Sequence, residues 1–181
     1  TPVISSAASD VYKRQKYFSE AGYRLKLGRS NNLQYGPFAG TAQERADDIN
    51  EMFSNPEIDA IFCARGGYGA NKVLPLLDYE IIRSNPKIFL GYSDITAYLN
   101  SITQKTDLVT FHGPMLSSFR KEFVHYNYDS MVNMLGSSSK VTISCPENIS
   151  PRILRPGTCK GKIWGGNLTL ITNRLGSSDA L

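Results

Sequence analysis

The sequence predicts an α/β protein with an open, mostly parallel sheet flanked by helices. Two short apolar runs, residues 58–63 and 88–90, are each typical of a buried strand, and each leads into a glycine-containing turn. Segments with a helical pattern lie before, between and after these runs. Such alternation indicates βαβ units. Both strands are therefore expected to end at one edge of a flavodoxin- or Rossmann-like sheet, where folds of this class build their sites.

The helix before the first of these strands has the clearest start. Residues 41–44 (T-A-Q-E) form a capping box, in which the Thr41 hydroxyl and the Glu44 carboxylate satisfy free N–H groups. Residues 55–56 (N-P) end the helix. The apolar residues that recur at helical spacing are expected to face the core: Ala46, Ile49, Met52 and Phe53.

The remaining elements follow from shorter patterns. Alternating apolar residues predict a strand at residues 23–27, and further strands are expected at 108–111 and 141–143, with a strand and turn at 161–166. Helices are expected at residues 71–77, 79–83, 95–102, 128–135 and 167–175.

Composition excludes several classes of protein. The 181 residues are 41% hydrophobic and 20% charged, which suits a globular protein with a buried core. The net charge of +4 is spread out and forms no basic block, so no nucleic-acid partner is expected. No apolar run is long enough to cross a membrane, and no signal peptide is recognisable. The three cysteines are widely spaced, which favours reduced thiols and a cytoplasmic location over a disulfide framework or a zinc site.

Ser93 is the candidate nucleophile. It follows the strand at residues 88–90 on a short turn, where a serine is held out from the backbone near the N–H groups of the next helix. The G-x-S-x-G pattern is met only in its first half, because Gly91 is present and Ile95 stands at the last position. The alternative is that Ser93 and Asp94 simply cap the helix.

The turn at Gly66 and Gly67 allows three interpretations. Its backbone N–H groups could approach a reacting oxygen, or cradle a phosphate, or the glycines could only supply positive φ. Neither the dinucleotide fingerprint nor the Walker A spacing is present. His112 could serve Ser93 as a base, or could position a loop or contact substrate. Cys63 could be a thiol nucleophile, although a buried structural role fits a strand end better.

Five stretches in this order resemble the LD-carboxypeptidase family of serine peptidases, which includes muramoyltetrapeptide carboxypeptidases and microcin-immunity proteins. They are residues 65–69 (RGGYG), 74–79 (LPLLDY), 91–96 (GYSDIT), 110–114 (TFHGP) and 161–169 (GKIWGGNLT).

The resemblance implies a mechanism of acyl transfer. Ser93 would attack the amide that joins an L-centre to the terminal D-residue of a murein tetrapeptide, in cell-wall recycling. The Asp94 N–H, with that of Gly66 or Gly67, would stabilise the oxyanion, while Arg65 and His112 would contribute to substrate binding. No metal or cofactor is implied, and the resemblance suggests a homodimer.

The resemblance also implies a division of the chain. Residues 1–15 match none of the motifs and are interpreted as a foreign or disordered start. Residues 16–136 form the α/β domain that carries the nucleophile. Residues 137–181 are a linker and the start of a smaller, β-rich domain. The family's catalytic glutamate and histidine lie beyond the last motif, so this chain alone is expected to be an inactive fragment.

Two other functions stay open. Within the family, the microcin-immunity branch cleaves peptide–nucleotide conjugates with the same triad. From a different class, the chain could be a non-catalytic module that binds a small peptide.

Overall fold

The computed structural model describes residues 18–20, 22–119, 125–137 and 139–177. Three short strands form one parallel sheet in the order β1-β2-β3. The bounds of the strands are β1 Ala60–Phe62, β2 Ile88–Gly91 and β3 Phe111–His112. The bounds of the helices are α2 Ala42–Ser54, α3 Tyr79–Ser84, α4 Thr96–Thr106, α5 His125–Gly136 and α6 Leu168–Asn173. The predicted α/β class with a parallel sheet is confirmed.

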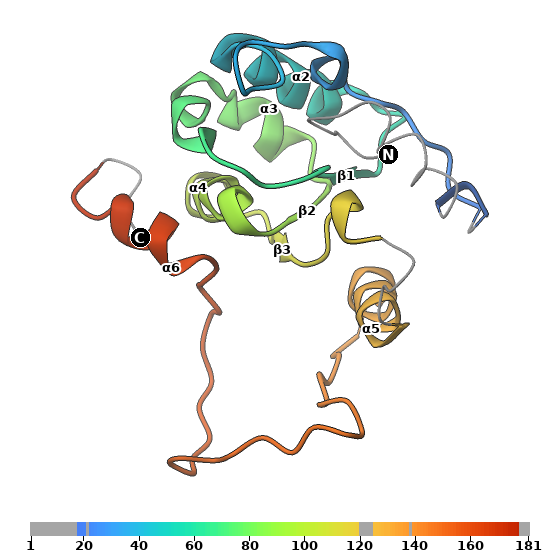
Figure 1. The fold of residues 1–181 in the computed structure, drawn as a ribbon, viewed down its shortest axis with the longest axis vertical. Helices are drawn as coiled ribbons and strands as arrows, with labels where there is room; N and C mark the ends of the chain where they lie inside the picture. The colour runs from blue at the N-terminus through green and yellow to red at the C-terminus, as the bar shows by residue number, and fades with distance from the viewer. Residues whose placement is uncertain (1–17, 21, 120–124, 138, 178–181) are drawn as a thin grey trace.

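The two faces of the sheet carry separate cores because neighbouring strand residues point to opposite sides. Ile61 and Phe89 pack with α2, α3 and α4 on one face. Phe62 and Leu90 pack with Phe18, Phe119 and Met131 of α5 on the other. Figure 1 shows α2, α3 and α4 grouped together and α5 apart from them. All three strands point the same way, so their carboxyl ends share one edge.

The capping box at the start of α2 is confirmed. The Thr41 side chain accepts a hydrogen bond from the Glu44 N–H, and the Glu44 carboxylate accepts one from the Thr41 N–H at 2.8 Å. The four predicted core residues of α2 are all buried. The helix ends at Ser54, immediately before the predicted stop.

The predicted helix at residues 71–77 is two 3-10 turns, η2 (Ala70–Lys72) and η3 (Leu74–Leu76). Pro75 lies at the start of η3, and its ring and missing N–H do not allow an α-helix to continue through it.

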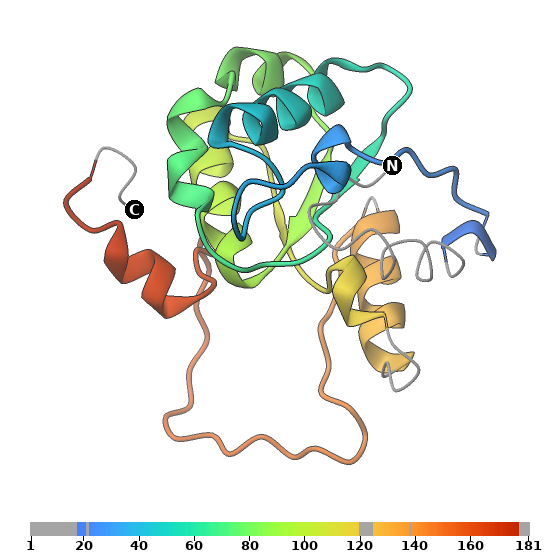
Figure 2. The same ribbon diagram turned by 45° about the horizontal axis from the view of Figure 1, so that its top comes forward.

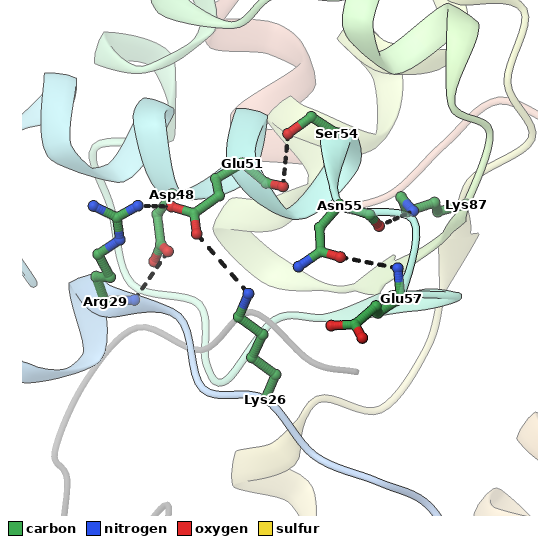
Figure 3. Close-up of polar contacts among 8 residues, drawn as sticks. All are labelled: Lys26, Arg29, Asp48, Glu51, Ser54, Asn55, Glu57 and Lys87. Atoms are coloured by element: carbon green, nitrogen blue, oxygen red, sulfur yellow. Dashed lines mark hydrogen bonds and ion pairs between the residues drawn. The ribbon is translucent and has the colours of Figure 1, made fainter.

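The predicted strand at residues 23–27 is wrong: this segment has no regular secondary structure. Polar contacts with α2 hold the end of this segment and the chain just after it (Figure 3). Asp48 of α2 is buried and accepts hydrogen bonds from the Arg29 and Ser30 N–H groups at 2.9 and 3.0 Å, and Lys26 lies 3.9 Å from Glu51. Gly28 permits this approach, since a Cβ there would lie 2.4 Å from an Asp48 carboxylate oxygen.

A long excursion joins α5 to α6. In both views the chain leaves the sheet after α5 and returns at α6 (Figures 1 and 2), and residues 139–167 contain no strand. The predicted strands at 141–143 and within 161–166 are therefore also wrong. In the described part of the chain no strand pairs with either segment, and a single extended segment cannot form a ladder of hydrogen bonds.

Candidate active site

Ser93 lies on the predicted strand-to-helix turn, between β2 and α4. It opens the 3-10 turn η4 (Ser93–Ile95) and has a φ of +62°. This left-handed conformation costs a residue with a Cβ roughly 1–2 kcal/mol. Gly91 makes the turn sterically feasible, because a Cβ there would lie 2.6 Å from the Ile95 side chain. A serine held in a strained turn at the end of a parallel strand is the geometry of a nucleophile elbow.

Gly66 brings a second turn, after β1, against the elbow. A Cβ on Gly66 would lie 2.8 Å from the Ser93 Cβ and 3.3 Å from the Asp94 nitrogen, so only glycine fits there. Within the described chain, neither the Gly66 N–H nor the Asp94 N–H donates a hydrogen bond. Among the described residues both N–H groups are therefore without a partner, and both belong to residues that adjoin Ser93. Gly67 has a φ of +139°, so it also meets the requirement for positive φ.

The Asp94 side chain is buried and bonded to the turn that follows β1. It is 7% exposed, and its Oδ2 accepts a hydrogen bond from the Ala70 N–H at 3.0 Å. Burial raises the pKa of this carboxyl, while the Ala70 hydrogen bond and the positive charge of Arg45 act in the opposite direction. The Asp94 N–H is thus left without a partner among the described residues, while its side chain binds the neighbouring turn.

The structure brings Arg65 and His112 to the same edge but does not join them to Ser93. Arg65 is exposed, and its Nε donates to the Gly66 carbonyl at 3.4 Å. His112 is exposed at the end of β3, where its ring meets that of Tyr92 at 6.3 Å. No hydrogen bond joins Ser93 to a histidine or a glutamate in the described ranges, so the geometry does not make His112 the base.

A small pocket lies behind the elbow, between α2, the Gly66 turn and α4. Its lining includes Arg45, Cys63, Asp94 and Tyr98. Burial raises the pKa of the Cys63 thiol to about 12, so the thiol is protonated at neutral pH and is a poor nucleophile. Burial likewise raises the pKa of Tyr98. The sequence alone did not single out Arg45 or Tyr98. The only indication was their position: Arg45 lies next to the apolar residues of α2, and Tyr98 next to those of α4.

The last motif docks onto the helix that follows the elbow. Gly166 has a φ of +134°, and a Cβ there would lie 2.5 Å from the Thr96 side chain. The next residue, Asn167, donates its N–H to the Thr96 hydroxyl at 2.9 Å and caps α6. Arg174 is buried and donates to the Ala97 carbonyl at 3.1 Å. Figures 1 and 2 both show α6 beside α4.

A match to a protein-family model identifies the family to which the chain belongs. A family model described as the LD-carboxypeptidase N-terminal domain (peptidase S66) matches residues 2–113. The chain belongs to the LD-carboxypeptidase family. The match extends further towards the N-terminus than the motifs did, since it includes most of residues 1–15.

Individual members of the LD-carboxypeptidase family match over most of the chain. A probable murein peptide carboxypeptidase of Bacillus subtilis (strain 168) is 41% identical over 163 residues, which are 89% of this chain and 50% of that protein. The microcin C7 self-immunity protein MccF of Escherichia coli is 34% identical, over 97% of this chain and 59% of its own length. The chain therefore spans about half the length of the curated relatives it matches.

The fold agrees with a solved structure of the family. Microcin C7 self-immunity protein MccF in complex with aspartyl sulfamoyl adenosine superposes with a TM-score of 0.82 at 30% identity. The superposition covers 99% of this chain and 64% of that one.

No helix among the described residues combines the length and the apolar character needed to cross a membrane. Nor does the described part of the chain gather three side chains of the kinds that ligate metal ions.

Proposed function

We propose that the complete protein is a serine carboxypeptidase that removes the terminal D-amino acid from a murein tetrapeptide. The observation that carries the proposal is the strained Ser93 turn with Gly66 packed against it. Membership of the LD-carboxypeptidase family, with a relative named as a probable murein peptide carboxypeptidase, supports the substrate class.

The proposed reaction uses Ser93 Oγ as the nucleophile. A base takes the hydroxyl proton as Oγ bonds to the carbonyl carbon of the L,D-amide, and the carbonyl oxygen becomes an oxyanion. The N–H groups of Asp94 and Gly66 donate to that oxyanion. Cleavage of the C–N bond releases the D-amino acid, whose nitrogen takes up the proton. Water then hydrolyses the ester on Ser93, which regenerates the hydroxyl.

The base is proposed to come from outside the described residues. A serine hydrolase needs a base and a group to orient it. Ser93 has no such partner in the described part of this chain. We therefore propose that the 181-residue chain alone does not turn over the tetrapeptide, and that a histidine and a glutamate elsewhere in the complete protein complete the triad.

The test measures release of the D-amino acid by the protein expressed from its complete natural reading frame. We expect Ser93→Ala to lower kcat by roughly 10⁴- to 10⁶-fold. Ser118→Ala is the matched control: its hydroxyl lies near the same edge, 3.4 Å from the Tyr92 hydroxyl. An active Ser93→Ala variant would refute the nucleophile. Turnover by the 181-residue chain would refute the proposed origin of the base.

A second candidate is hydrolysis of a peptide–nucleotide conjugate. It is favoured by the fold, which superposes with MccF in complex with aspartyl sulfamoyl adenosine over 99% of this chain. The ratio of kcat/KM for the tetrapeptide to that for an aminoacyl sulfamoyl adenosine decides between the two substrates.

A non-catalytic module would instead bind peptide equally well with and without the Ser93 hydroxyl and would release no product. The cytoplasmic location and the homodimer stay predictions.

A further inference from the structure

One peptide unit beside the elbow is held from both ends. The Ala70 N–H donates to Asp94 Oδ2 at 3.0 Å, and the Gly69 carbonyl accepts a hydrogen bond from Arg45 Nη2 at 3.4 Å. These two groups belong to the single peptide that joins Gly69 to Ala70. An acidic side chain from the elbow and a basic side chain from α2 therefore fix its position and its orientation.

Aromatic packing restrains the same peptide. A Cβ on Gly69, which has a φ of +95°, would lie 2.8 Å from the Phe38 ring. The Arg45 guanidinium lies over that ring, 5.1 Å from its centroid. The Tyr68 ring meets it edge-on at 5.0 Å. Ring, guanidinium and carboxylate together leave this peptide little freedom.

The turn that leads to this peptide needs such support. Residues 66–69 contain three glycines and no helix or strand, and glycine restricts the backbone least of all residues. Gly66, whose N–H is a proposed oxyanion donor, lies only four residues before Ala70. The position of the Gly69–Ala70 peptide therefore limits where the Gly66 N–H can lie.

We propose that Asp94 and Arg45 are positioning residues that set the spacing of the two oxyanion donors by holding the Gly69–Ala70 peptide between them. Asp94 then acts twice: its own N–H is one donor, and its side chain anchors the turn that carries the other. Arg45 acts from the opposite end of the peptide and compensates the buried negative charge. This inference rests on the proposed function, in which both N–H groups face the oxyanion.

The test compares Asp94→Ala with Asp94→Asn in the protein from the complete reading frame. Loss of one oxyanion donor typically lowers kcat by about 10²- to 10³-fold, so we expect Asp94→Ala to lower kcat by about 10²-fold, with KM within about threefold. Asp94→Asn keeps an oxygen acceptor for the Ala70 N–H and should recover most of kcat. Arg45→Ala should lower kcat less, by about tenfold, because its hydrogen bond is longer.

A purely structural role is separated by a matched control. The Asp78 side chain also accepts backbone N–H bonds, at 3.0 and 2.9 Å, but at the start of α3. Asp78→Ala should lower the thermal midpoint and leave kcat unchanged. If Asp94→Ala behaves in the same way, the positioning role is refuted. If Asp94→Ala does not fold, Arg45→Ala decides the matter: kcat within twofold of the original would overturn the proposal.

Amide hydrogen exchange separates failure of this inference from failure of the proposed function. In the 181-residue chain, we expect the Ala70 N–H to exchange at least about tenfold faster in Asp94→Ala, with the amides of α3 unchanged. Unchanged Ala70 exchange would overturn the inference. Suppose that Ala70 exchanges faster in Asp94→Ala but the complete protein releases no D-amino acid. The hold of Asp94 on the Gly69–Ala70 peptide would then be supported, and the proposed carboxypeptidase function would be refuted.

Discussion

The turns at the sheet edge are tightly packed, whereas the chain between α5 and α6 leaves large apolar side chains exposed. Around the elbow, Gly66 and Gly91 are packed so tightly that a single added Cβ would clash with a neighbour. In the excursion, Ile153, Leu154 and Ile163 are 74%, 83% and 97% exposed. A local apolar pattern therefore forms packed structure only where another element lies against it.

The largest expected difference concerns the stability of the two regions. Phe89 is fully buried and stacks on Phe53 at 5.9 Å between ring centroids. Phe89→Ala should therefore lower the free energy of unfolding by about 3–5 kcal/mol. Ile163→Ala, at the exposed position, should change it by less than about 0.5 kcal/mol. Urea unfolding of both variants measures the two changes. Similar losses of unfolding free energy would contradict the difference in packing between the two regions.

A smaller effect is expected where the excursion rejoins the α/β part. Gly166→Ala places a Cβ against Thr96 in a positive-φ conformation and should cost about 1–3 kcal/mol, with faster proteolysis of the α6 segment. Gly157 is the matched control, since a Cβ there meets nothing within 4 Å. If Gly157→Ala and Gly166→Ala are equally stable and equally resistant to protease, α6 is not docked through this glycine.

Strain at the elbow predicts a stabilising loss of function. Ser93→Gly relieves the positive φ and should raise the free energy of unfolding by about 1 kcal/mol while it abolishes D-amino acid release. Asp107 has a φ of +58° just after α4, so Asp107→Gly should give a similar gain with activity retained. Thermal melts and turnover of both variants check this. Destabilisation by Ser93→Gly would contradict the strain.

The smallest effect is the pH dependence of the capping box. Hydrogen bonds from Thr41 lower the pKa of the Glu44 carboxyl in the folded protein. A lowered folded-state pKa contributes stability above the unfolded-state pKa, and that stability is lost as the pH falls through the folded-state value. Glu44→Gln should therefore be less stable than the original at neutral pH. The two proteins should converge in acid, as measured by thermal melts across pH. A constant difference would contradict this origin.

Local chemistry made much of the site predictable. The Thr41 capping box, the serine turn and the glycine turn depend on neighbouring residues, and the structure places each of them as expected. Pro75 explains why the predicted helix at residues 71–77 is broken, since its ring and missing N–H do not allow an α-helix to continue through it. Arg45 could not be assigned, because its role arises from a contact with Gly69, which lies 24 residues away.

The failed strands have one cause. Residues 23–27, 141–143 and 161–164 have strand-like patterns, yet the sheet of the described residues pairs only β1, β2 and β3. Pairing is a property of the assembled sheet, so the pattern alone cannot supply it. The same limit applies to the general base, which the described residues do not bring to Ser93.

Covalent labelling shows whether Ser93 is a nucleophile. The protein from the complete reading frame is treated with a serine-directed fluorophosphonate, and its intact mass and peptide map are recorded. We expect one adduct, on Ser93, that is absent from Ser93→Ala and kept in Ser118→Ala. A folded protein that releases the D-amino acid but carries no adduct on Ser93, or carries it on another residue, would contradict the claim.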